Sequence, residues 1–141
     1  MSHKLNLPKL YASLLYFNYI LGTMIHEYGH LFMSRILGYG AEIRYHALDK
    51  VYYTNQTPIG TDLTMIRLYG GFTLYVLYAC LSLFINGEPE ARIGIQTAMI
   101  YNLIYAVQEG IYGYMSPQCL IVILVAEILY LIHVFKVTSF K

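Results

Sequence analysis

The chain has 141 residues, of which 57% are hydrophobic and only 12% are charged, and its formal net charge is +1. This composition is too apolar for an ordinary soluble domain and predicts an integral membrane protein. No long basic run occurs, so nothing supports a nucleic-acid-binding surface and we expect no nucleic-acid partner. Cys80 and Cys119 both fall within apolar stretches, where we interpret them as small buried hydrophobic residues.

Four apolar segments follow one another along the chain, and each is near or above the length of about 20 residues that spans a bilayer. They cover about 10–37, 61–85, 92–115 and 117–135. The first is longer than a signal-peptide core and has no small-residue exit, so we expect a retained helix. The sequence therefore predicts a single membrane-embedded domain over 1–141. We expect an all-α membrane protein with four transmembrane helices, and the sequence does not say which membrane they cross.

The stretch between the first two segments, about 41–58, differs in kind from the rest. Glu42–Ala47 alternates polar and apolar residues, and Val51–Thr54 is rich in strand formers. We therefore predict a short β-hairpin at the membrane surface. It is either an edge that pairs with an extended substrate or an ordered connector, and the sequence favours neither.

The first apolar segment contains His26-Glu27-Tyr28-Gly29-His30. Two histidines four positions apart lie on one face of a helix, so both imidazoles can reach one metal ion while Glu27 lies beside the remaining position. This H-E-x-x-H pattern is typical of a zinc hydrolase, in which the glutamate moves a proton between water and the leaving amine. The other interpretation is a pair of buried, hydrogen-bonded core histidines without metal.

The third metal ligand is predicted from depth in the membrane. The first and third segments run in the same direction, because each connection reverses the chain. Glu109 follows Arg92 by as many residues as His26 follows Lys9, so both lie about 26 Å along their helices. Glu109 is therefore our choice for the third ligand.

Other acids and histidines remain alternatives to Glu109. Glu127 lies nearer the membrane midplane, where we expect it to be neutral or to support a ligand. His46 and Asp49 lie in the hairpin, on the correct side of the membrane but in a surface loop. A site with no third side chain is also open, whereas His133 lies near the far end of the fourth segment and is too distant.

The order of these parts resembles the site-2 protease family of intramembrane zinc metalloproteases over roughly residues 10–115. The family has an H-E-x-G-H helix, a surface hairpin and a second helix with a glycine-proline pair, where this chain has Gly70-Gly71. Its third helix carries an asparagine and then Leu-Asp-Gly, whose aspartate binds zinc. Here the corresponding stretch, Asn102–Gly110, has Glu109 in place of the aspartate and one residue closer to Asn102.

The resemblance implies a minimal or divergent intramembrane zinc endopeptidase that cleaves transmembrane or membrane-bound peptides. Zn²⁺ would be the cofactor, held by His26, His30 and Glu109, with Glu27 as the catalytic base. By the same resemblance Asn102 stabilises the oxyanion, although a helix-helix hydrogen bond explains it equally well. The expected partners are the lipid bilayer and a membrane protein or peptide substrate; the oligomeric state is not encoded.

Two functions of other classes stay open from the sequence. One is a non-hydrolytic metal or redox membrane protein, although a di-iron bundle needs a second Glu-x-x-His, which the chain lacks. The other is a catalytically inactive homologue that acts as a membrane scaffold.

Overall fold

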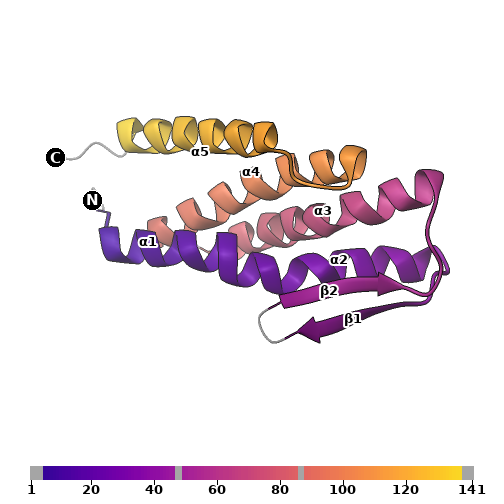
Figure 1. Cartoon of the computed structure of the whole chain (residues 1–141). Helices are drawn as coiled ribbons and strands as arrows, with labels where there is room; N and C mark the ends of the chain where they lie inside the picture. The colour runs from indigo at the N-terminus through magenta and orange to yellow at the C-terminus, as the bar shows by residue number, and fades with distance from the viewer. Residues whose placement is uncertain (1–4, 47–48, 86–87, 138–141) are drawn as a thin grey trace.

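The structure is a computed structural model that describes residues 5–46, 49–85 and 88–137. It is mainly helical, with two short paired strands (Figure 1). The helices are α1 (Leu7–Leu15), α2 (Gly22–Ile36), α3 (Gly60–Phe84), α4 (Pro89–Tyr112) and α5 (Pro117–Val137). The strands are β1 (Ala41–His46) and β2 (Asp49–Thr54), and a π-helical segment, η1 (Tyr16–Leu21), joins α1 to α2.

The sequence predicts one regular helix over 10–37, and the structure differs there because the chain widens into η1. Asn18 explains the change. Its side-chain amide donates to the Leu14 carbonyl at 2.9 Å and to the Thr97 hydroxyl at 3.2 Å, which interrupts the regular helical ladder. The hydroxyl of Tyr78 donates to the Phe17 carbonyl in the same turn. The widened turn is therefore stabilised by side-chain hydrogen bonds to α3 and α4.

Caps and glycines define the helix ends. The side-chain oxygen of Asn6 caps α1 by accepting from the Lys9 backbone amide at 3.2 Å. The backbone amide of Asn6 donates to the Glu90 carboxylate at the start of α4. Helix α4 begins with Pro89 and ends at Gly113, whose φ of 78° suits glycine. These contacts bring the start of α1 and the start of α4 together.

The core lies between η1, α3 and α4. Leu74 and Tyr78 of α3 and Ile95 and Ala98 of α4 are 0–1% exposed, and residues of η1 and α2 pack against them. Helix α3 has its most extensive contacts with α4 and α2, whereas α5 packs mainly on α4. The paired strands lie against α2, on the side of the bundle away from α5 (Figure 1). His46 and Asp49 are register partners at the ends of these strands.

Two of the described helices, α3 and α5, are long and apolar enough to cross a membrane. The first predicted span is divided by η1, and α4 carries polar side chains along its length. Helix α5 exposes large apolar side chains over most of its surface, among them Ile121 and Leu129, each 61% exposed. Exposed apolar surface of this extent is typical of contact with lipid or with another apolar surface.

Candidate metal centre

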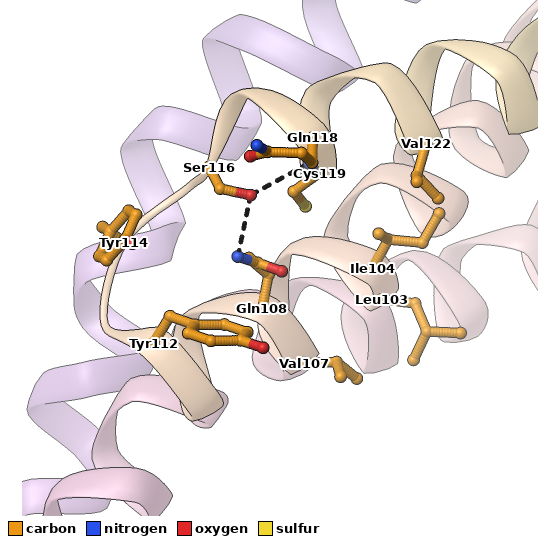
Figure 2. Close-up of a pocket in the computed structure, with 10 residues that line it drawn as sticks. All are labelled: Leu103, Ile104, Val107, Gln108, Tyr112, Tyr114, Ser116, Gln118, Cys119 and Val122. Carbon is orange, nitrogen blue, oxygen red and sulfur yellow. Dashed lines mark hydrogen bonds between the residues drawn. The ribbon is translucent and has the colours of Figure 1, made fainter.

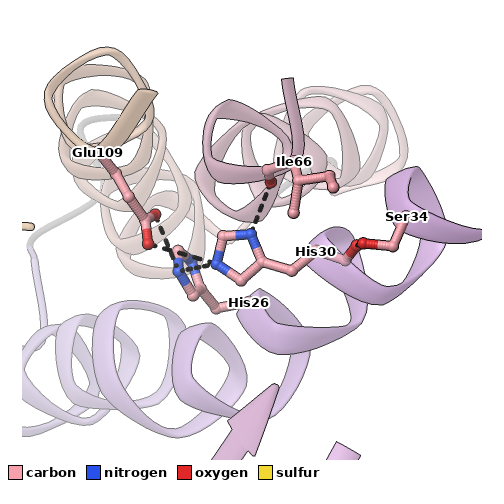
Figure 3. A network of polar contacts seen from close by, with 5 residues as sticks. All are labelled: His26, His30, Ser34, Ile66 and Glu109. Atoms are coloured by element: carbon pink, nitrogen blue, oxygen red, sulfur yellow. Dashed lines mark hydrogen bonds and ion pairs between the residues drawn. The ribbon is translucent and has the colours of Figure 1, made fainter. Parts of the chain in front are cut away.

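His26 and His30 project from one face of α2 toward α3 and α4 (Figure 3). Their rings are 4.7 Å apart and perpendicular, and their Nε2 atoms are separated by 3.1 Å. His30 is 6% exposed, and the side chain of His26 is 13% exposed. The predicted helical spacing therefore brings two imidazole nitrogens to one buried point.

Hydrogen bonding orients His30. Its Nδ1 lies 2.7 Å from the carbonyl oxygen of Ile66 on α3, and since a carbonyl can only accept, Nδ1 is the protonated nitrogen. In the neutral ring, Nε2 then carries a lone pair aimed at the common point. Ser34 donates to the His30 carbonyl at 2.8 Å one turn later in α2. Metal-binding histidines in proteins are commonly oriented by such a carbonyl acceptor.

Tyr105 of α4 is the aromatic partner of His26. The two rings stack with centroids 5.1 Å apart and an angle of 27° between their planes. Tyr105 precedes Glu109 by one helical turn, so both residues project from the same face of α4. Sequence reasoning missed Tyr105, although its spacing from Glu109 was the signal that could have found it.

Gly70 of α3 leaves the space that the imidazoles occupy. A Cβ atom at Gly70 would lie 2.4 Å from Cε1 of His30 and 2.7 Å from Cε1 of His26, and real Cβ atoms essentially never approach so closely. The contact between the two helices is equally close at Gly29, where a Cβ would lie 2.3 Å from the Tyr69 carbonyl. Glycine is therefore required on both helices for the histidines to pack against α3.

Glu109 reaches the two histidines from α4 (Figure 3). Its Oε2 lies 3.2 Å from Nε2 of His26, and its Oε1 lies 3.4 Å from Nε2 of His30. Oε2 is nevertheless a buried atom without a hydrogen bond, so the close approach to His26 lacks hydrogen-bond geometry. A buried carboxylate oxygen that accepts no hydrogen bond is costly, and a cation between these atoms would compensate it.

The donor set fits a zinc ion. Ligands bound to tetrahedral zinc at about 2.0–2.1 Å lie about 3.3 Å from one another. The two Nε2 atoms are 3.1 Å apart, and each has a different oxygen of the Glu109 carboxylate close to this spacing, at 3.2 Å from His26 and 3.4 Å from His30. Two imidazoles and a carboxylate are also a common set of protein ligands for catalytic zinc.

Glu27 lies beside the histidines. Its carboxylate and the ligand nitrogens of His26 and His30 all fall within 4.8 Å of one another, so this group by itself could hold a metal ion. The oxygens of Glu109 are closer to the nitrogens, at 3.2 and 3.4 Å, and they approach from across the bundle. By distance, Glu109 is therefore the better candidate for the third ligand, and Glu27 is a second carboxylate beside the histidines.

The remaining candidates have other contacts. Asn102 is 2% exposed and donates to the Ala98 carbonyl at 2.7 Å, a bond within its own helix. Glu127 and His133 belong to α5, and among the described contacts neither joins the two histidines of α2. The side chains of His46 and Asp49 lie outside the described part of the chain. No family model, curated protein or solved structure matches this chain. The chemistry of the site is therefore inferred from its own residues.

Proposed function

We propose that this protein is an intramembrane zinc metallopeptidase that resembles the site-2 proteases. The single observation that carries the proposal is the convergence of His26, His30 and Glu109 from two helices onto one buried point. Glu27 follows His26 directly and lies within reach of the same point. Two histidines, a ligand carboxylate and a neighbouring free carboxylate are the parts that metal-assisted peptide hydrolysis requires.

Zn²⁺ would be held by the Nε2 atoms of His26 and His30 and by the carboxylate of Glu109. When bound, zinc lowers the pKa of water and polarises a peptide carbonyl. Glu27 accepts the proton from water and returns it to the leaving nitrogen. The Ile66 carbonyl and the Tyr105 ring hold the imidazoles in their orientations, which limits the reorganisation needed during the reaction.

The substrate class follows from the surroundings of the site. The helices that carry it would cross the bilayer as a bundle of four spans: the continuous helical path α1–η1–α2, then α3, α4 and α5. The length and apolar character of α3 and α5 support this arrangement, as do the exposed apolar side chains of α5. A peptide reaching the site would therefore be a transmembrane or membrane-bound segment, unwound locally so that its backbone is accessible. Pairing with the β1–β2 edge would keep such a segment extended.

Metal content tests the ligand set. We expect about one zinc per chain in detergent-purified wild-type protein. Zinc should be lost in His26→Ala and weakened in Glu109→Gln. His133→Ala and Glu127→Gln are matched controls, because they make the same two kinds of substitution in α5, and both variants should retain zinc. Absence of zinc from folded wild-type protein supplied with the metal would refute the proposal.

Glu27→Gln tests the catalytic role separately from metal binding. The variant should keep its zinc, because Glu27 is not a ligand in this proposal, and should lose cleavage. The readout is the appearance of new peptide ends within membrane proteins of cells that express the wild type. Glu88→Gln is the control, because the side chain of Glu88 is 62% exposed and distant in sequence from the site. Undiminished cleavage by Glu27→Gln would overturn the mechanism and favour a different role for the site.

A further inference from the structure

A cleft of about 620 Å³ lies between α4 and α5, beside the turn that joins them (Figure 2). Its volume is within the range of about 300–1,000 Å³ that is usual for small-molecule sites. It belongs to the α5 side of α4, whereas Glu109 points toward α2. The cleft is therefore separate from the candidate metal centre.

The end of the cleft near the turn is polar. The Gln108 amide donates to the Ser116 hydroxyl oxygen at 3.1 Å, and the Cys119 backbone amide donates to the same oxygen at 3.1 Å. Ser116 thus accepts twice, which leaves its own proton to donate. Within the described residues, the Gln108 carbonyl oxygen makes no hydrogen bond that would occupy it. Ser116 and Gln108 together present a hydroxyl proton as a donor and a side-chain carbonyl oxygen as an acceptor, and Tyr112, Tyr114 and Gln118 add further uncharged polar groups.

The other end of the cleft is apolar. Leu103 and Ile104 of α4 line it together with Val122 of α5, and the two α4 residues lie about 13 Å along that helix from Tyr112 at the polar end. None of the lining residues of the cleft is charged. Because α5 begins at Pro117, the polar end lies where this helix would enter the bilayer, and the apolar end lies deeper. This gradient of polarity is that of a lipid molecule.

We propose that the α4–α5 cleft binds a neutral glycerolipid, with a headgroup hydroxyl against Ser116 and Gln108 and one acyl chain along Ile104 and Val122. A hydroxyl both donates and accepts, which matches the donor and the acceptor that Ser116 and Gln108 present. No lining residue supplies a counter-charge for a charged headgroup, and the Arg67 guanidinium, which lies against Gly113 of the turn, is not part of the lining; the lining therefore favours an uncharged lipid. The inference goes beyond the peptidase proposal, but it rests on the same placement of α5 in the membrane.

Tryptophan fluorescence gives a direct test, because the wild-type chain contains no tryptophan. Tyr112→Trp introduces a reporter at the cleft, and Leu129→Trp introduces one on the exposed surface of α5 outside the cleft. The protein is reconstituted in phosphatidylcholine vesicles, to which monoacylglycerol is added as a quencher, brominated on the acyl-chain carbons next to the ester, the part of the chain that would lie nearest to residue 112. We expect saturable quenching of the Tyr112→Trp reporter at low mole fraction and only gradual, unsaturated quenching of the Leu129→Trp reporter.

Two valines of α5 provide a matched pair of second substitutions in the Tyr112→Trp protein. Val122 is 54% exposed and lines the cleft, whereas Val125 is 51% exposed and does not. Both sites tolerate a larger side chain because both are open. Val122→Phe should abolish the saturable quenching by filling the apolar end, and Val125→Phe should leave it unchanged.

Three results would overturn the lipid site: identical quenching curves for the two reporters, an unaffected curve in Val122→Phe, or equal saturable quenching by brominated phosphatidylglycerol, which is anionic. Failure of the membrane placement gives a different signature. In that case the Leu129→Trp reporter would not be quenched by any brominated lipid, and the peptidase proposal would lose its membrane setting as well. Quenching of Leu129→Trp without a saturable phase at Tyr112→Trp rejects the lipid site alone.

Discussion

Replacing Gly70 by alanine should cost most of the zinc affinity while leaving the fold intact. The new Cβ would lie 2.4 Å from Cε1 of His30, 2.6 Å from its Nε2 and 2.7 Å from Cε1 of His26. Carbon atoms in contact prefer about 3.5 Å or more, so both rings must retreat by about 1 Å. Metal sites tolerate displacements of only about 0.2 Å in ligand distance.

The expected loss is at the upper end of the range for substitutions that disturb ligand orientation, about 100-fold in zinc affinity or about 2.7 kcal/mol. Gly70→Ala removes a flexible residue from the interior of α3, which by itself favours the helix by about 1 kcal/mol. Loss of zinc in a protein whose helix propensity has improved would therefore identify a steric effect at the site.

The assay is competition for zinc between the purified protein and a chelating dye, with helix content followed by circular dichroism. Gly22→Ala is the matched control: this glycine also lies in a helix, and a Cβ there would meet the Phe17 carbonyl at an ordinary 3.5 Å. It should bind zinc like the wild type. Wild-type zinc affinity in Gly70→Ala would show that the imidazoles do not occupy the space beside α3, and the ligand geometry would be wrong.

Three further predictions concern the ring that stacks on His26, the metal and the widened turn. Tyr105→Phe should retain zinc affinity because the stacked ring remains, whereas Tyr105→Leu should lose about threefold to tenfold in the same dye assay; equal affinities would remove Tyr105 from the site. Zinc at about 100 times its dissociation constant should stabilise the wild type by about 2.7 kcal/mol, seen as a raised melting temperature that a chelator reverses, with no shift in His26→Ala. Asn18→Ala removes the bond to Thr97 and should destabilise the protein by about 1–2 kcal/mol in detergent unfolding, whereas Asn55→Ala on the exposed connection should be nearly neutral.

The three residues of the candidate metal centre could be predicted from the sequence, because the argument for them uses only positions along the chain. A spacing of four puts His26 and His30 on one helix face, and equal distances from Lys9 and Arg92 put Glu109 at the same depth. The structure brings these three side chains together. Helical periodicity and distance along a helix follow from residue numbers alone, so they can be predicted without knowing how the helix is rotated or which helices pack against it.

The supports of the site depend on contacts between helices and could not be predicted in that way. The acceptor for His30 is the backbone carbonyl of Ile66. Because every residue has a backbone carbonyl, nothing in the sequence distinguishes Ile66 as the partner. The stacking of Tyr105 on His26 depends on how α4 is rotated against α2. The π-helical turn at Asn18 depends on Thr97, which lies on α4 and far along the chain.

The hydrogen bonds inside the bundle distinguish the candidate metal centre from polar side chains with a structural role. The Tyr130 hydroxyl donates to Gln96 between α5 and α4, and the Asn102 amide donates within α4. In the described parts of the chain, only Asn18 Oδ1 and Glu109 Oε2 are buried side-chain polar atoms without a hydrogen bond.

Of these two atoms, only that of Glu109 belongs to an acid with two imidazole nitrogens within 3.2–3.4 Å of its carboxylate. A plain structural ion pair would be expected to align a ring N–H with each carboxylate oxygen, because a hydrogen bond to a charged group is worth about 1.5–3 kcal/mol. An approach of His26 to Glu109 without hydrogen-bond geometry is what we would expect if the two side chains shared a cation. Glu109→Gln therefore discriminates the two interpretations: a structural pair predicts a change in stability alone, and a metal centre predicts loss of zinc from a folded protein.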